Sequence, residues 1–192
     1  MNPDICLETS RLYLRRWREG DLVPFRRMNR DPAVIEFLPG PLSDEESDAL
    51  AERADRAIAE RGYGLYAVEV KSAGRFAGFV GLSMTAPGFR FGEKVEVGWR
   101  LCREAWGYGY ATEAGRRCLE HGFSCGLDEI VSFTYEGNRR SRAVMERLGM
   151  HRNSEDDFDH PRIPEGHPLR RHVLYRLTRD EWSTETRSHD GP

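Results

Sequence analysis

The chain has 192 residues, of which 39% are hydrophobic, and its formal net charge at pH 7 is -3. This length is enough for one domain with a substantial core and short for two, so we expect a single domain over residues 1–182. The lysines and arginines are dispersed and form no basic stripe, which argues against a dedicated nucleic-acid surface.

The cysteines and the first residues give expectations about the compartment. The four cysteines form no Cys-x-x-Cys pair, and the N-terminus has neither a basic segment nor an apolar run of the signal-peptide kind. No apolar run approaches the roughly 18 residues that a membrane helix needs. The expected location is the reducing cytoplasm, without membrane attachment.

The first predicted elements are a strand and a helix. Near-alternating apolar residues predict a strand over residues 11–17. Asp21 is placed to cap a helix, and the Pro at position 32 stops it. The N-terminal segment therefore begins with the pattern β then α.

A second helix and a hairpin follow. Ser43 and Glu46 have the spacing of a capping box, and Gly62 marks the end of that helix. Residues 64–84 read as two strands joined by a short turn, an antiparallel hairpin. Residues 85–93, rich in Gly and Pro, are expected to be a mobile loop that contacts an acceptor.

A glycine-rich turn then links a strand to an amphipathic helix. Residues 95–101 have a β-type pattern, Gly107 and Gly109 follow, and helical periodicity begins near Ala111. Glycine lets backbone N–H groups approach a phosphate without a Cβ in the way, and a helix N-terminus carries about half a positive charge. The expected ligand of this turn is a polyphosphate.

Two common polyphosphate loops do not match the turn. The Gly-Lys-Ser/Thr sequence of a Walker-type loop is absent, and so is a third glycine at the dinucleotide spacing. ATP and NAD are therefore disfavoured as ligands.

The C-terminal third begins with another strand and a capped helix. Residues 130–135 predict the strand, Asn138 is placed to cap the helix, and Gly149 ends it. Residues 155–172 form an acidic and histidine-containing segment where we expect acceptor specificity to reside. Residues 183–192 are polar and without pattern, and we expect a disordered tail.

Three segments, in order, resemble one enzyme family. They are Leu7–Trp17, the spacing Trp106-x-x-Gly109-x-Ala111, and Asn138–Ser141 followed by Leu148-Gly149-Met150. Together they resemble the GNAT acetyltransferases and, within them, the RimJ/RimL-like branch of ribosomal-protein N-acetyltransferases. The similarity covers residues 7–182, and Trp106 departs from the Gln or Arg that is usual at its position.

This resemblance implies an α+β GNAT fold with a mixed, mostly antiparallel central sheet, helices on both faces and a V-shaped split between strands four and five. It also implies acetyl-CoA as acetyl donor, with pantetheine pairing along the fourth strand and a backbone N–H near Leu101 polarising the thioester carbonyl. The implied coenzyme contacts are Leu101, Cys102, Arg103, Trp106, Gly107, Tyr108, Gly109, Tyr110, Ala111, Thr112, Asn138 and Ser141.

Two residues are candidates for the catalytic proton transfers. Glu96 lies between Val95 and Val97, and a carboxylate with apolar neighbours can have a raised pKa, as a general base requires. The alternative is a glutamate on a solvated face. Ser141 is the candidate donor to the thiolate, because Met145 stands where the family often has a tyrosine; alternatively Ser141 only satisfies the first helical turn and solvent protonates the thiolate.

The histidines of the C-terminal segment invite a metal interpretation that their spacing does not support. They lack the i, i+4 helical geometry and the paired cysteines of recognisable metal sites, so no metal is predicted. His160 and His172 are candidate acceptor contacts, with structural hydrogen bonding as the alternative.

The resulting hypothesis is an acetyl-CoA-dependent N-acetyltransferase. It would acetylate a primary amine, on a protein N-terminus or a small molecule, by direct attack in a ternary complex, since no cysteine has an obvious activating base. The alternative is a non-catalytic acyl-CoA-binding or sensing module. An RNA- or ribosome-associated protein would require a basic face. A homodimer is common in the family, and the sequence leaves the oligomeric state open.

Overall fold

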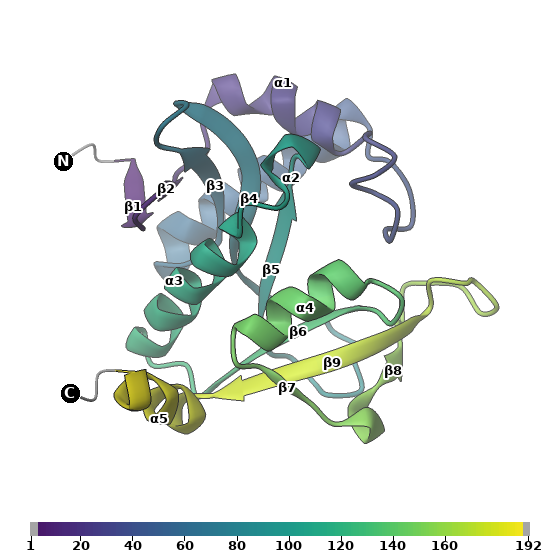
Figure 1. Cartoon of the computed structure of the whole chain (residues 1–192). Coiled ribbons are helices and arrows are strands. Elements are labelled where there is room, and N and C mark those ends of the chain that lie inside the picture. Colours follow the sequence, from purple (N-terminus) through teal and green to yellow (C-terminus); the bar gives the residue numbers. More distant parts are fainter. Residues whose placement is uncertain (1–3, 190–192) are drawn as a thin grey trace. The chain divides into compact units, whose positions relative to one another are not determined.

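The computed structural model describes residues 4–189, and the chain divides into two compact units (Figure 1). The first unit is Met1–Ser83 with Gly98–Cys118, and the second is Met84–Val97 with Leu119–Pro192. Each unit is thus built from two separate segments of the sequence. The expectation of one domain over residues 1–182 stays a prediction.

The first unit combines antiparallel strands with two helices. Its strands follow one another as antiparallel neighbours from β1 to β4. The elements are β1 (Ile5–Glu8), β2 (Leu12–Arg15), α1 (Glu19–Met28), α2 (Asp44–Arg61), β3 (Leu65–Val70) and β4 (Arg75–Met84). The hairpin expected over residues 64–84 is confirmed as β3 and β4. The strand predicted over residues 11–17 is confirmed as β2, and the structure adds β1 before it.

Helix α2 has the ends that its sequence predicts. The Ser43 hydroxyl accepts a hydrogen bond from the Glu46 N–H over 3.2 Å, and the Glu46 carboxylate accepts one from the Ser43 N–H over 2.7 Å. This reciprocal pair is a capping box. The helix ends at Gly62, whose φ of +77° is the left-handed conformation that glycine adopts at low cost.

Helix α1 begins earlier than predicted, because Asp21 has another role. Asp21 lies within the first turn rather than before the helix, and its Oδ2 accepts a hydrogen bond from the Arg18 N–H over 2.9 Å. Both Asp21 oxygens also pair with the guanidinium of Arg15, at 2.6 and 2.8 Å. Asp21 is therefore not the N-cap residue itself: it caps the helix from its third position and is also a buried ion-pair partner.

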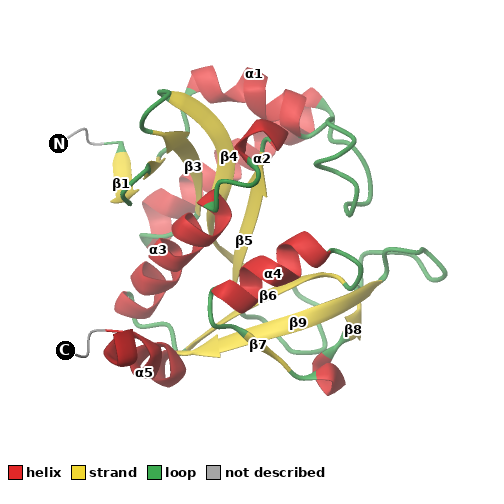
Figure 2. Cartoon of the chain, in the orientation of Figure 1, coloured by secondary structure: helices red, strands yellow, loops and turns green. Residues whose placement is uncertain are grey.

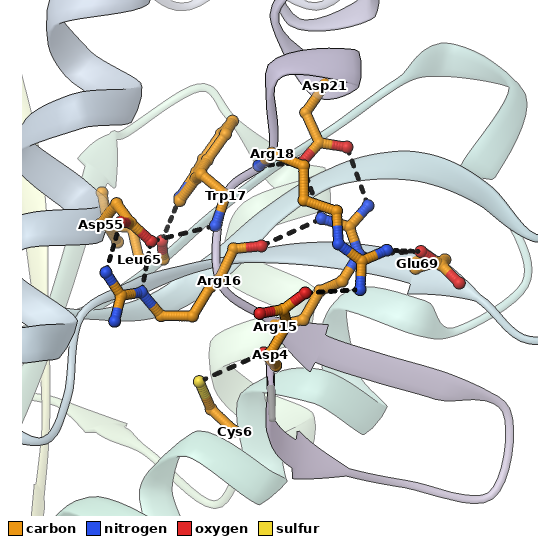
Figure 3. Close-up of polar contacts among 10 residues, drawn as sticks. All are labelled: Asp4, Cys6, Arg15, Arg16, Trp17, Arg18, Asp21, Asp55, Leu65 and Glu69. Carbon is orange, nitrogen blue, oxygen red and sulfur yellow. Dashed lines mark hydrogen bonds and ion pairs between the residues drawn. The ribbon is translucent and has the colours of Figure 1, made fainter. Parts of the chain in front are cut away.

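Figure 3 shows two ion-pair groups that hold β2 to its neighbours. Arg15 pairs with Asp21 and, over 2.8 Å, with Glu69 of β3; Arg15 and Asp21 are 3% and 4% exposed. Arg16 binds both carboxylate oxygens of Asp55 on α2. Because a buried charge is costly without its partner, the contacts of Arg15 fix how β2, β3 and α1 meet. The more exposed pair of Arg16 and Asp55 links the residue after β2 to α2.

Aromatic side chains fill the core between the helices and the sheet of the first unit. Phe25, Met28, Ala51 and Phe79 form the buried cluster. The ring of Trp17 packs 4.7 Å from that of Phe25, and its indole N–H donates to the carbonyl of Leu65 over 2.8 Å. Apolar burial thus holds α1 and α2 on this sheet.

The second unit is centred on one long strand, β9. It pairs antiparallel with β6 along the whole of β6 and also with β7 and β8. The elements are β6 (Glu129–Tyr135), α4 (Arg139–Arg147), β7 (His151–Arg152), a 3-10 turn (Ser154–Asp156), β8 (Phe158–Asp159), β9 (Arg171–Thr178) and α5 (Arg179–His189). The strand and the capped helix predicted for this part of the chain are confirmed.

Residues 85–93 form a loop, as expected, and Phe89 of this loop is 8% exposed and packs with Phe158 and Phe133 in the core of the second unit. One expectation for the second unit is wrong. Residues 183–189, expected to belong to a disordered tail, are helical as part of α5 (Figure 2). The remaining tail residues, 190–192, lie outside the described part of the chain.

Strand β5 (Val95–Leu101) and helix α3 (Tyr110–Ser124) complete the α+β fold. The strand order is β1-β2-β3-β4-β5-β6-β9-β7, with β8 beside β9, and β5 with β6 is a parallel pair in an otherwise mostly antiparallel sheet. In the described residues of these two strands, pairing is confined to Val95 with Ile130 and Glu96 with Val131. Pairing at only these two positions agrees with the predicted V-shaped split of the sheet.

Among the helices of the described residues, none is both long and apolar enough to cross a bilayer.

Candidate functional site

The predicted glycine turn lies between a short 3-10 turn (Arg103–Ala105) and helix α3. Gly107 and Gly109 have φ values of +82° and +79°, which side chains other than glycine rarely adopt. A Cβ at Gly107 would meet nothing within 4 Å, so the requirement for glycine comes from the backbone conformation and not from crowding.

Six consecutive backbone N–H groups are left without a protein acceptor at this turn. Within the described part of the chain, no hydrogen bond is made by the N–H groups of residues 107–112; the first in α3 is from Glu113 to the carbonyl of Gly109, at 3.0 Å. Three of the six belong to the first turn of α3, where helices leave donors unpaired. Residues 107–109 are exposed. The turn is therefore a concentration of solvated donors at a helix N-terminus, which suits a diphosphate.

Trp106 ties the turn to the end of β5. Its indole N–H donates to the carbonyl of Leu101 over 2.9 Å. The N–H of Cys102 donates to Ala77 of β4, also over 2.9 Å, and backbone groups of successive strand residues point to opposite sides. The Leu101 N–H therefore points away from β4, as required of the group expected to polarise a thioester.

A carboxylate on the first turn of α3 anchors the β1–β2 connection. Glu113 accepts hydrogen bonds from the Thr9 hydroxyl at 2.6 Å and from the Arg11 N–H at 3.0 Å, and it forms an ion pair with the Arg11 guanidinium. That guanidinium lies 4.9 Å from the ring centroid of Tyr110, which stacks on Tyr108. The sequence pattern assigns no role to Glu113, because only the fold brings positions 11 and 113 together.

Glu96 has the electrostatic character that was predicted for a base. It is half-buried on β5 between Val95 and Val97, which are 6% and 0% exposed. Burial raises the pKa of Glu96 to about 8. In the described residues its carboxylate has neither a hydrogen-bond donor nor a cation as partner. A carboxylate on a solvated face would keep its ordinary pKa, so this environment favours the catalytic hypothesis.

Asn138 acts as the predicted helix cap. Its Oδ1 accepts from the Ser141 N–H over 3.2 Å, and its Nδ2 donates to the Thr134 hydroxyl over 3.1 Å. Met145, one turn further, is 1% exposed and belongs to the interior. The coenzyme contacts of Asn138 and Ser141 stay predictions, and both residues belong to the second unit together with Glu96.

His160 and His172 come together in an aromatic cluster of the second unit. Their ring centroids are 4.9 Å apart, and both rings lie beside Phe133 and Phe158. His160 Nδ1 accepts from the Arg162 N–H at 3.2 Å, whereas His172 Nδ1 lies 3.1 Å from the Arg170 carbonyl, to which it must donate. Burial and its neighbour His172 lower the pKa of His160 to about 4. Both histidines thus make structural hydrogen bonds, and their contact with an acceptor stays a prediction.

Metal ligation and covalent catalysis find no support in the described residues. No group of three or more His, Cys, Asp or Glu side chains there is arranged to hold a metal ion. Cys102 packs against the core of the first unit, and burial together with Glu104 raises the pKa of its thiol to about 11. At neutral pH this thiol is protonated and a weak nucleophile.

Comparisons with known proteins agree with the geometry of the turn and the sheet. The profile of the family described as "Acetyltransferase (GNAT) domain" matches residues 11–151. The uncharacterized protein YkkB of Bacillus subtilis is 31% identical over 155 residues, which cover 79% of this chain and 88% of that protein.

Solved structures show the same fold. A GNAT-family acetyltransferase from Bacillus anthracis has a TM-score of 0.75 at 22% identity, covering 91% of this chain and 98% of that one. The spermidine N-acetyltransferase from Vibrio cholerae, solved with CoA and spermine, has a TM-score of 0.69 at 18% identity, covering 91% and 99%.

Proposed function

Because the chain belongs to the GNAT acetyltransferase family, we propose that it moves the acetyl group of acetyl-CoA to a primary amine by direct attack in a ternary complex. The six unpaired N–H groups of residues 107–112 are the observation that carries this proposal. They suit the diphosphate of coenzyme A, and the RimJ/RimL-like motifs around them favour that branch of the family.

The chain's own residues supply the steps around the reacting carbonyl. The Leu101 N–H, directed away from β4, donates to the thioester oxygen and stabilises the charge that develops there. The main chain of residues 101–103 aligns the pantetheine arm. The indole hydrogen bond of Trp106 to the Leu101 carbonyl holds the glycine turn against the end of β5.

Glu96 takes the proton from the attacking amine. With a pKa of about 8 it is close to the pKa of an α-amine, about 7.8, so the transfer is nearly balanced in energy. After attack, the carbon–sulfur bond breaks and the thiolate takes a proton from Ser141 or from solvent. The protonated state of Cys102 supports transfer without an acetyl-cysteine intermediate.

A primary amine on a small molecule or on a protein N-terminus is the proposed acceptor. The Vibrio cholerae neighbour, named for its action on spermidine, shows that this fold accommodates an amine acceptor in a relative. We place the enzyme in the cytoplasm and propose that it acts without a metal.

The decisive experiment measures acetyl-CoA binding by calorimetry and free-thiol release with a mixed panel of amines. Gly109→Ala is expected to weaken binding about tenfold or more, because alanine is strained at a φ of +79° and the donors lose their alignment. Gly166→Ala is the matched control, with a φ of +77° in a turn of the other unit, and should bind as the wild type does.

Each outcome assigns the function differently. Absence of acetyl-CoA binding by the wild type overturns the proposal. Binding without thiol release for any amine replaces it with the non-catalytic sensing module.

A further inference from the structure

We propose that Arg100 binds an anionic group, a carboxylate or a phosphate, on the amine that this enzyme acetylates. The inference deepens the proposed function and rests on it. It concerns a cluster in the first unit formed by Arg100, Asn29, Ser47 and Phe79, to which the sequence pattern assigns no role.

Buried neighbours fix the position of the Arg100 guanidinium. Its Nη1 donates to Oδ1 of Asn29 over 2.7 Å, and its central carbon lies 5.5 Å from the ring centroid of Phe79. Asn29 is 0% exposed, and its Nδ2 donates to the hydroxyl of Ser47, which is also 0% exposed. The cation is therefore oriented by a hydrogen bond and an aromatic face rather than left to sample solvent.

The backbone at Arg100 is equally constrained. A Cβ at Gly78 of β4 would collide with the Arg100 carbonyl oxygen, so a glycine lets the two strands approach at this point. The backbone N–H of Asn29 closes the end of α1. Both ends of the Asn29–Arg100 contact thus belong to rigid elements.

Arg100 has no acidic partner in the described part of the chain, unlike three other arginines of its unit whose guanidinium groups are also held in place. Arg15, Arg16 and Arg26 each bind an aspartate. Among the residues that the structure describes, none places a carboxylate within ion-pair distance of Arg100. Burial lowers the pKa of Arg100 to about 10, a sign of a partly desolvated charge without compensation.

The missing partner is of a definite chemical type. Arginine has five N–H donors, and Asn29 uses one of them. Arg100 is half-buried, so the remaining donors can meet an incoming group. Their planar fork matches the paired oxygens of a carboxylate or a phosphate.

The position of Arg100 assigns that group to the acceptor. It immediately precedes Leu101, whose N–H is the proposed donor to the thioester. An amine that attacks at Leu101 therefore brings the rest of its molecule to the neighbourhood of Arg100. The diphosphate of the coenzyme already has the six donors of the glycine turn.

The test uses small amines that differ in one group: 3-aminopropanoate, 2-aminoethyl phosphate and the neutral 3-aminopropanamide, with dipeptides carrying a free or an amidated C-terminus. Thiol release gives kcat/KM for each. The same probes are titrated by calorimetry into protein saturated with CoA, so that discrimination is measured even without turnover.

For the wild type, kcat/KM and affinity are expected to be about tenfold or more higher for the carboxylate or the phosphate probe than for the neutral amide. Arg100→Gln should reduce this preference to about twofold or less while acetyl-CoA affinity stays within about twofold of the wild-type value. Arg30→Gln is the matched control, since Arg30 is an exposed arginine paired with Asp44, and should keep the preference.

Asn29→Asp gives an independent and nearly isosteric test. The new carboxylate would pair with Arg100 internally, while the Ser47 hydroxyl can donate to it. This variant should lose the preference for anionic acceptors although Arg100 is still present.

Three results would overturn the assignment. The first is a wild type that treats charged and amidated probes alike in both assays. The second is a preference that persists in Arg100→Gln. The third is weaker acetyl-CoA binding by Arg100→Gln with the preference for anionic probes intact. This result would mean that Arg100 binds a phosphate of the coenzyme. Failure of the proposed function is separate, since it shows as absent acetyl-CoA binding by the wild type.

Discussion

The carbonyl of Leu101 accepts a hydrogen bond from the indole of Trp106 over 2.9 Å, so the residue that opens the glycine turn also closes the end of β5. Trp106→Phe keeps an aromatic ring and removes the donor. A hydrogen bond contributes about 1 kcal/mol, so we expect acetyl-CoA affinity, measured by calorimetry, to fall about fivefold.

Trp106→Gln is the matched comparison, because glutamine has a side-chain N–H and is one of the residues usual at this position in the family. It should bind acetyl-CoA more tightly than Trp106→Phe. Equal affinities for the wild type and Trp106→Phe would show that the indole bond does not organise the turn.

Glu96→Gln should lower kcat with little change in acetyl-CoA affinity. Since burial raises the pKa of Glu96 to about 8, the wild-type base is mostly protonated at pH 7 and mostly ionised at pH 9. The acceptor amine titrates in both proteins, so the ratio of wild-type to variant rates isolates Glu96. That ratio should rise through about pH 8; a ratio of one at every pH removes Glu96 from the mechanism.

The same residue makes a prediction about stability. The pKa of Glu96 is higher in the folded chain than in the unfolded one, so the folded state binds more protons between about pH 4.5 and 8. The contribution of protonated Glu96 to the free energy of unfolding is fully present below about pH 4.5 and is lost as the pH rises through about 8. In urea unfolding, Glu96→Gln should therefore gain stability relative to wild type from pH 5 to pH 9, by at most a few kcal/mol. A pH-independent difference would contradict the raised pKa.

Asp21→Asn tests the buried ion pair of the first unit. It leaves the guanidinium of Arg15, which is 3% exposed, without full compensation, and should cost about 3 kcal/mol in the free energy of unfolding. Asp128→Asn breaks an exposed pair with Arg179 and should cost about 0.5 kcal/mol or less. Similar losses for the two variants would mean that burial does not set the strength of these contacts.

Cys102→Ser tests direct transfer. The thiol has a pKa of about 11 and packs in the core, so its replacement should leave kcat within about threefold, the remaining change coming from packing. Mass spectrometry of the wild type mixed with acetyl-CoA should show no acetylated Cys102. A trapped acetyl-cysteine would replace direct attack with a two-step route.

The local parts of the fold could be predicted from sequence because their causes are local. The capping box of Ser43 and Glu46, the Asn138 cap and the positive-φ glycines of the turn each depend on residues within a few positions. The start of α1 was placed too late, since Asp21 acts from inside the first turn, where it accepts from the Arg18 N–H and pairs with the buried Arg15.

The candidate site divides in the same way. The glycine turn has a readable spacing, and apolar neighbours in sequence pointed to the raised pKa of Glu96. The roles of Glu113 and Arg100 could not be read, because Glu113 acts on Arg11 and Arg100 on Asn29, partners about 70 to 100 positions away. Helix α5 was missed since its polar composition carries no clear periodicity.

The trio of Arg15, Asp21 and Glu69 also limits how this sequence can drift over evolutionary time. Replacing Arg15 or Asp21 alone by a neutral residue leaves a buried charge without its full compensation, whereas replacing both together does not. Single-step changes at these two positions therefore pass through less stable intermediates, so we expect the two positions to change together.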